Sequence, residues 1–187
     1  MSSLPPTDRL YLVAIPQGEL LEYALRAQGL LAQRYGLYRR LPRLHVTLEM
    51  LPALSPAQLT RAIYIIDEIC GNTQRLALES RGFQCFPQPH RAMVLTIHED
   101  EALGELRAGL QRELGNMSLT RDYPDWQLHI TIASTLYAAQ PWDHDQYEEL
   151  CALMPRGSVQ KGYCEHLELW KSTIHPEPEI LARFSLG

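Results

Sequence analysis

Two short segments of the sequence each carry a histidine and, two residues later, a threonine. These His-x-Thr segments are His45-Val46-Thr47-Leu48 and His129-Ile130-Thr131-Ile132. An imidazole with a pKa of about 6.5 can accept or donate a proton near neutral pH, and a threonine hydroxyl can donate a hydrogen bond to an anionic oxygen. Two such pairs facing one another could supply a general base, a general acid and two donors, which suits the cleavage of a phosphodiester.

The two segments are informative as a pair, although either one alone is not. In a chain with 7 histidines, a bare His-x-Ser/Thr pattern is expected roughly 0.7 times by chance. Requiring threonine, with apolar residues at the other two positions, lowers the expectation to roughly 0.07, so two hits have a chance of about a few in a thousand. We therefore interpret the segments as parts of one site.

Both segments have the alternation of a half-buried strand. Alternate side chains of a strand share a face, so His45 and Thr47 are predicted to project together into a groove, as are His129 and Thr131. The apolar side chains predicted to anchor these strands in the core are Val46, Leu48, Met50, Leu128, Ile130 and Ile132.

Hydrophobic periodicity and turn signals predict alternating strands and helices. Strands are predicted over 9–15, 43–51, 75–83, 92–97, 126–133 and 161–171, helices over 19–35, 56–70, 100–114 and 141–154, a loop over 87–89 and a short last segment over 179–186. Ser55 followed by Pro56 is typical of a helix N-cap and first helical position.

The order strand, helix, His-x-Thr strand, helix, strand occurs twice. Ile15 and His45, like Ile97 and His129, are separated by about 30 residues, and this matching predicts an internal duplication. We expect an α+β fold in which two pseudo-symmetric, duplicated strand-helix-strand lobes face each other across a central cleft. A chain of 187 residues is long enough for one such core, so residues 1–187 are predicted to be a single domain.

The charge of the chain restricts its partners. The net charge is −5, from 17 basic and 22 acidic residues, whereas proteins that bind long nucleic acids usually carry an excess of Lys and Arg. If the substrate is RNA, we expect an RNA end, a short oligomer or a nucleotide.

The sequence has no sign of a metal site, a cofactor or a membrane segment. The four cysteines (Cys70, Cys85, Cys151 and Cys164) are scattered and are expected to be reduced and partly buried, forming neither a disulfide framework nor a zinc site. No apolar run approaches the length of a membrane span, and the first residues lack a signal-peptide pattern. We expect a cytoplasmic monomer.

At this point the sequence resembles the two-histidine (2H) phosphoesterases, in particular the 2′,5′ RNA ligase and RNA cyclic-phosphodiesterase branch. The segments that carry the resemblance are the strand ending Ala14-Ile15-Pro16, both His-x-Thr segments, Phe83…Phe86-Pro87, the helix over 103–114 with Gly115, and Leu167-Glu168-Leu169-Trp170-Lys171-Ser172. The resemblance implies a bilobal fold, catalytic roles for His45 and His129, phosphate binding by Thr47 and Thr131, and substrates such as 2′,3′-cyclic phosphates, 2′,5′ linkages or ADP-ribose cyclic phosphate.

Several other residues could take part in this site. Arg43 shares the strand parity of His45 and could contact substrate, or lie in a solvated turn. Tyr11 and Trp126 could stack on a base or simply pack in the core or at its rim. Glu49 is predicted on the same face as His45, where it would orient a neighbour or meet water.

The sequence leaves three functions open. The first is hydrolysis of a 2′,3′-cyclic phosphate or a 2′,5′ linkage, and the second is reversible 2′,5′ RNA ligation, the same chemistry in reverse. The third is a binding module for phosphorylated RNA ends or nucleotides. It is suggested by Ala133-Ser134, which stands where many relatives have an arginine.

Overall fold

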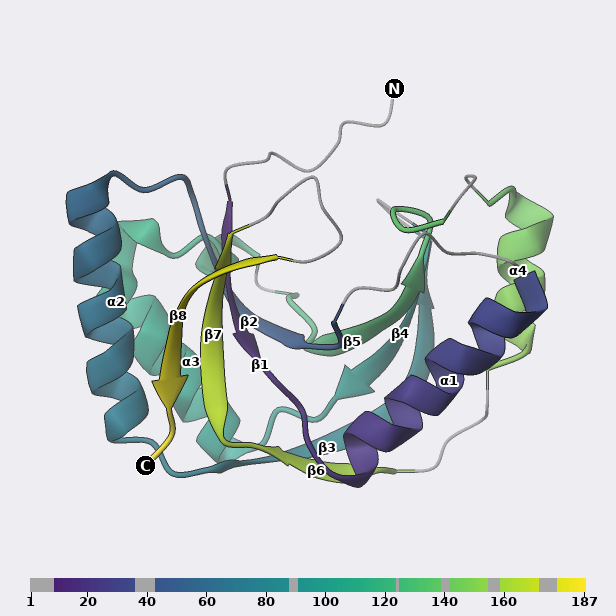
Figure 1. Cartoon of the computed structure of the whole chain (residues 1–187), viewed down its shortest axis with the longest axis horizontal. Coiled ribbons are helices and arrows are strands. Elements are labelled where there is room, and N and C mark those ends of the chain that lie inside the picture. The colour runs from purple at the N-terminus through teal and green to yellow at the C-terminus, as the bar shows by residue number, and fades with distance from the viewer. Residues whose placement is uncertain are drawn as a thin grey trace.

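The computed structural model describes residues 9–35, 43–87, 91–123, 125–138, 142–154, 159–171 and 178–187. These residues form one sheet flanked by helices (Figure 1). In chain order the elements are β1 (Leu10–Ala14), α1 (Glu19–Tyr35), β2 (Val46–Leu51), α2 (Pro56–Gly71), β3 (Leu76–Phe86), β4 (Ala92–Ile97), α3 (Glu101–Leu114), the 3-10 helices η1 (Gly115–Met117) and η2 (Thr120–Asp122), β5 (His129–Ser134), α4 (His144–Ala152), β6 (Lys161–Cys164), β7 (His166–Lys171) and β8 (Glu179–Ser185).

The sheet has eight strands in the order β6-β3-β4-β5-β2-β1-β7-β8, and each neighbouring pair is antiparallel. The two His-x-Thr strands, β5 and β2, lie side by side at its centre. Each is flanked by the strand that opens its half of the chain, β4 or β1. This symmetry of strand order supports the proposal that the single domain consists of two related lobes.

The helices cover one face of the curled sheet (Figure 1). Helix α1 contacts β5, β6 and β3, whereas α3 contacts β2, and α2 contacts β8 and α3. The helix that follows each opening strand therefore packs on the central strand of the other half. The two halves share one core, and the predicted α+β fold is confirmed.

The two faces of the sheet differ in what they carry. Along β1, Leu10, Leu12 and Ala14 belong to the main core shared with the helices. The alternate residues Val13 and Ile15 form a small separate cluster on the opposite side with Trp170 of β7 and Tyr11. We call this second side, which the helices do not cover, the open face.

Local signals account for the helix boundaries. Ser55 and Gln58 form a reciprocal capping box at the start of α2, with Pro56 at the first turn, as predicted. Asp100 caps α3 by accepting a hydrogen bond of 2.9 Å from Leu103 N. At the end of α3 the chain turns at Gly115, whose φ of 54° is in a region that favours glycine.

The prediction of one strand over 161–171 was wrong. The chain bends at Glu165 and forms two strands there. Strand β6 pairs with β3 at one edge of the sheet, while β7 pairs with β1 and β8 in the other half. A continuous apolar pattern cannot show that its two ends belong to different parts of a sheet. Of the predicted loop over 87–89, residues 88 and 89 lie outside the described residues.

Strict alternation also fails inside both His-x-Thr strands, because each contains a β-bulge at the fourth residue of its segment. In β2, Thr47 pairs with Val13 and Glu49 with Leu12, so Leu48 is skipped. In β5, Thr131 pairs with Val94 and Ala133 with Met93, so Ile132 is skipped. A bulge reverses the parity of the residues beyond it. Each side chain after the bulge therefore lies on the face opposite to the one that strict alternation predicts.

Two predictions for β2 are corrected by this bulge. Met50 is buried but lies opposite Tyr11 on the open face instead of anchoring the main core. Glu49 lies opposite Leu12 on the helix side and is fully buried. Its carboxylate accepts hydrogen bonds from Ser118 Oγ at 2.8 Å and from Thr120 Oγ1 at 2.6 Å. Glu49 therefore organises the segment after α3 and neither faces the histidines nor meets water.

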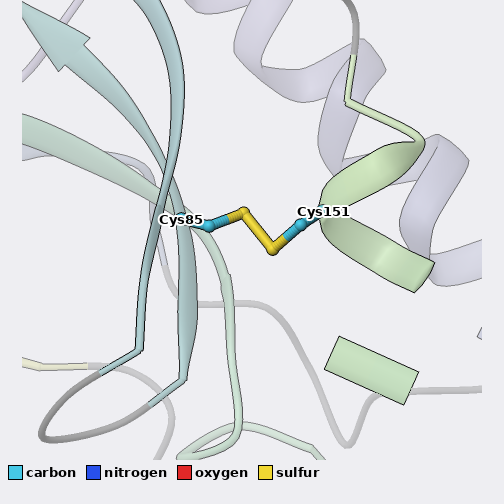
Figure 2. The surroundings of a disulfide bond; sticks show 2 residues. All are labelled: Cys85 and Cys151. Carbon is cyan, nitrogen blue, oxygen red and sulfur yellow. A yellow bond between two sulfur atoms is a disulfide. The ribbon is translucent and has the colours of Figure 1, made fainter. Parts of the chain in front are cut away.

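A disulfide joins Cys85 of β3 to Cys151 of α4 (Figure 2), with their Cα atoms 6.2 Å apart. This corrects the expectation that all four cysteines are reduced. Strand β3 extends to Phe86, beyond the predicted end, and this extension brings Cys85 to α4. Cys70 and Cys164 are free and buried.

Breaking this disulfide should destabilise the protein. The bond closes a segment with a sequence separation of 66 residues, so its loss should lower the free energy of unfolding by about 2–4 kcal/mol. Urea unfolding of the wild type with and without reductant, and of the Cys85→Ser/Cys151→Ser variant, measures this. Reductant should leave the double variant unchanged. A wild type equally stable in both conditions would contradict the prediction.

Candidate active site

The structure brings the two His-x-Thr segments together at the centre of the sheet. Val46 pairs with Ile130 in the single bridge that joins β2 and β5. In antiparallel register this bridge places His45 opposite Thr131 and His129 opposite Thr47, on the open face. The four side chains singled out in the sequence therefore lie in two adjacent rows on one surface.

Both imidazoles make the same type of hydrogen bond, from Nδ1 to a backbone carbonyl. His45 Nδ1 lies 2.8 Å from the carbonyl oxygen of Arg43, and His129 Nδ1 lies 2.8 Å from that of Gln127. A carbonyl oxygen only accepts hydrogen bonds, so Nδ1 must carry the proton in each ring. In the neutral imidazole this leaves the lone pair on Nε2, which can then accept a proton.

Each histidine contacts at least one aromatic ring. The ring centroids of His45 and Trp170 are 4.6 Å apart. The ring centroid of His129 lies 5.2 Å from that of Phe86, in an edge-to-face arrangement, and 6.4 Å from that of Trp126. Trp126 thus lies beside a predicted catalytic residue. Phe86 was noted in the sequence only through the family resemblance, and the contact of Trp170 with His45 was not predicted.

This environment favours the neutral form of both imidazoles. The pKa of His45 is lowered to about 4, mainly by burial and also by the charges of His129 and Arg43, against the opposing effect of the hydrogen bond to the Arg43 carbonyl. Burial also lowers the pKa of His129, again against the effect of its backbone hydrogen bond. The influence of His129 on His45 reflects the proximity of the two rings.

The two threonines present available hydroxyls. Thr47 and Thr131 are partly exposed, and neither hydroxyl bonds to another group within the part of the chain that the structure describes. A hydroxyl that is not already engaged can donate to a ligand. Each therefore could contact an anion placed between the imidazoles.

Arg43 lies next to His45, but it is already engaged by a residue that the sequence analysis did not select. Its Nη1 donates to both carboxylate oxygens of Glu168, at 3.2 and 3.0 Å. Glu168 belongs to β7 and is fully buried. The alternation Leu167-Glu168-Leu169-Trp170 could have placed Glu168 and Trp170 on one face.

Tyr11 also lies on the open face, where it packs against the cluster that contains Trp170. Burial raises the pKa of its hydroxyl, against the opposing charge of Arg9. A second tyrosine, Tyr137, follows β5. Burial and the neighbouring Tyr11 raise the pKa of Tyr137, which was not selected from the sequence.

A groove of about 720 Å³ lies elsewhere, between α2 and α3. Its walls carry residues of both charges, including Glu68, Arg75 and Arg112, and neither histidine of the candidate site lines it.

Over the described residues no group of three or more His, Cys, Asp or Glu is arranged to hold a metal ion. No helix there is long and apolar enough to cross a membrane.

The fold agrees with the comparisons. A model of the 2′-5′ RNA ligase superfamily matches residues 19–173. The chain therefore belongs to that superfamily, and the predicted relationship to the 2H phosphoesterases is confirmed. The members of this superfamily are phosphoesterases and ligases. No curated protein matches the sequence.

Solved structures share the fold at low sequence identity. TT0787 of Thermus thermophilus is 20% identical, with a TM-score of 0.67 over 95% of this chain and 97% of its own. LigT of E. coli, complexed with 3′-AMP, is 14% identical, with a TM-score of 0.67 over 96% and 98%. Usb1 of Kluyveromyces marxianus has a TM-score of 0.52 at 14% identity over 96% and 99%.

The low pKa of His45 should make the protein less stable in acid. Its pKa is lowered from 6.5 to about 4, so in this window the unfolded chain binds more protons than the folded one. The free energy of unfolding should therefore fall as the pH falls from 6.5 toward 4. Urea unfolding of the wild type and of His45→Gln measures this.

His45→Gln should lose less stability across that window than the wild type. Replacing the exposed His144 by glutamine is the matched control and should leave the wild-type slope unchanged. If His45→Gln and the wild type lose equal stability, His45 does not titrate as described.

Proposed function

We propose that the protein is a metal-independent phosphodiesterase that cleaves 2′,3′-cyclic phosphates or 2′,5′ linkages of RNA or nucleotides, with His45 and His129 as the acid-base pair. The observation that carries the proposal is the shared geometry of the two rings. Both have Nδ1 fixed on a backbone carbonyl. His45 immediately precedes β2 and His129 is the first residue of β5, and these two strands are paired. Each also lies opposite a threonine whose hydroxyl is available.

The reaction divides between the two imidazoles. Nε2 of one neutral ring takes a proton from water as the water oxygen forms a bond to phosphorus. The other ring, in its protonated form, gives a proton to the 3′ oxygen of the ribose as the bond from phosphorus to that oxygen breaks. The product is a 2′-phosphate with a free 3′-hydroxyl. Two histidines suffice for these proton transfers, so the proposal requires no metal ion or cofactor.

The lowered pKa values are compatible with this scheme. In the free protein both rings are predominantly neutral at neutral pH, since burial lowers both pKa values. A bound phosphodiester brings a negative charge close to the rings, and an opposite charge within about 4–6 Å raises the pKa of a histidine. Substrate binding therefore favours the protonation of one ring, which then acts as the acid.

The remaining contacts are assigned by the same proposal. Thr47 and Thr131 donate hydrogen bonds to the non-bridging oxygens, whose negative charge increases in the transition state. Trp126 and Tyr11 offer surfaces on which a base could stack, and Arg43 supplies positive charge beside His45. A nucleotide ligand is in keeping with the relative LigT, which has been crystallised with 3′-AMP, ATP and NADP+.

Reversible 2′,5′ ligation is the second candidate, because the superfamily takes its name from that activity. A 5′-hydroxyl would then replace water as the nucleophile, with the same two proton transfers. Comparing cyclic-ended RNA with and without a 5′-hydroxyl partner separates the two reactions. Formation of a 2′,5′ linkage only in the presence of the partner identifies ligation.

Activity should depend on both histidines and persist in chelator. The substrates to test in EDTA are 2′,3′-cyclic mononucleotides, 2′,5′ dinucleotides and ADP-ribose cyclic phosphate. His45→Ala and His129→Ala should each lower kcat by about 10²–10⁴-fold. Thr47→Ala and Thr131→Ala should lower it by about 10²-fold, because each removes one donor to the charged oxygens, and the serine variants should retain more activity.

The exposed His144 provides the matched control, since His144→Ala should behave as the wild type. A wild type that binds these nucleotides without turnover, with the same affinity in the two histidine variants, would show a binding module instead of an enzyme.

A further inference from the structure

Glu168 is a fully buried carboxylate on the open face, and it has four polar partners. Arg43 Nη1 lies at 3.0 and 3.2 Å from its two oxygens. Trp170 Nε1 donates to it at 2.7 Å, Arg183 Nε of β8 lies at 2.9 Å and His166 Nε2 at 3.4 Å. A buried charge is tolerated only when it is paired and hydrogen-bonded.

The carboxylate remains ionised in this setting. Burial raises the pKa of Glu168, but the hydrogen bond from Trp170 and the charges of Arg43, Arg183 and His166 outweigh burial, so the pKa lies below its ordinary value. Glu168 is therefore a fixed negative charge at neutral pH. It can hold its partners in place without itself titrating.

Two of these partners contact His45. The backbone carbonyl of Arg43 receives the Nδ1 hydrogen bond of His45 at 2.8 Å, and the guanidinium of the same residue is anchored on Glu168. The centroid of the Trp170 indole lies 4.6 Å from that of the imidazole. The indole N–H donates to the carboxylate of Glu168. One buried group thus restrains both the hydrogen bond and the ring contact of His45.

We propose that Glu168 is a positioning residue that fixes the orientation and tautomer of His45 through Arg43 and Trp170. The inference rests on the proposed function, in which His45 transfers a proton through Nε2. Glu168 itself does not touch the reacting atoms. Loss of its charge should release the Arg43 side chain, which is already 38% exposed, and allow the indole of Trp170 to move.

Although both histidines make the same type of backbone hydrogen bond, the groups around them differ. The ring contacts of His129 are with Phe86 and Trp126, and Thr96 is its partner in β4. None of these groups is charged. His129 therefore serves as an internal control, because a change at Glu168 should alter the tautomer of His45 and leave that of His129 unchanged.

Glu168→Gln tests this inference, since glutamine keeps the size and an acceptor for Trp170 but removes the charge. We expect kcat to fall by about 10–100-fold, as a displaced catalytic group causes, with KM within about 2-fold of the wild type. In ¹⁵N–¹H spectra of the imidazoles, the signals of His45 should show a mixture of tautomers, while those of His129 stay as in the wild type.

Two matched variants separate positioning from general destabilisation. Arg183→Gln removes a partner of Glu168 that does not contact His45, and Glu165→Gln removes an exposed carboxylate that pairs with Arg75. Both should keep the wild-type kcat and His45 spectrum. Trp170→Phe keeps an aromatic ring but removes the indole N–H that bonds to Glu168, and it should lower kcat by several-fold. This variant tests the inference if Glu168→Gln fails to fold.

The outcomes distinguish this inference from the proposed function. An unchanged His45 spectrum and kcat in Glu168→Gln would overturn the positioning role, as would an equal loss in Arg183→Gln. If the wild type turns over no substrate, the proposed function fails. The imidazole spectra then still show whether Glu168 holds His45.

Discussion

The pairing of β2 with β5 is the constraint on which the candidate site depends. One bridge, between Val46 and Ile130, joins the two halves of the sheet. The residues beside this bridge are the ones to which we assign the proposed chemistry. Because both strands belong to the same hydrogen-bonded layer and are backed by a common core, the distance between the imidazoles is set by regular backbone geometry instead of by mobile loops.

The electrostatic environment keeps both imidazoles neutral in the free protein. Burial disfavours a charged imidazole at either position, so the free protein presents two proton acceptors. In the proposed reaction, the negative charge of the ligand creates the acid by raising the pKa of one imidazole. A neutral molecule of similar shape would not produce this state, which links the protonation of the site to the binding of an anion.

The sequence predicted the central elements well, because their signals are local. The period of two in each His-x-Thr segment placed His45 beside Thr47, and the cap Ser55 marked where α2 starts. The family resemblance led to the same fold and is confirmed by the comparisons. The catalytic role of these two histidines stays a prediction.

The errors arose where non-local contacts decide the structure. The bulge at Leu48 reverses the faces of the residues beyond it, and hence Glu49 lies in the core, where it binds Ser118 and Thr120. No spacing in the sequence pairs Cys85 with Cys151, which are 66 residues apart. Glu168 was overlooked for the same reason, since its role depends on Arg43, from a distant part of the chain.

The crossed packing of α1 and α3 has a consequence for how the chain can be divided. Helix α1 comes from the first half but covers β5, and α3 comes from the second half but covers β2. A fragment that ended between β3 and β4 would expose the apolar side of its own β2 to water and would keep α1 without β5 and β6, two of the strands that this helix contacts. The two fragments would each be unstable alone, yet together could reassemble by exchanging helices, so cooperative unfolding should extend across the whole sheet.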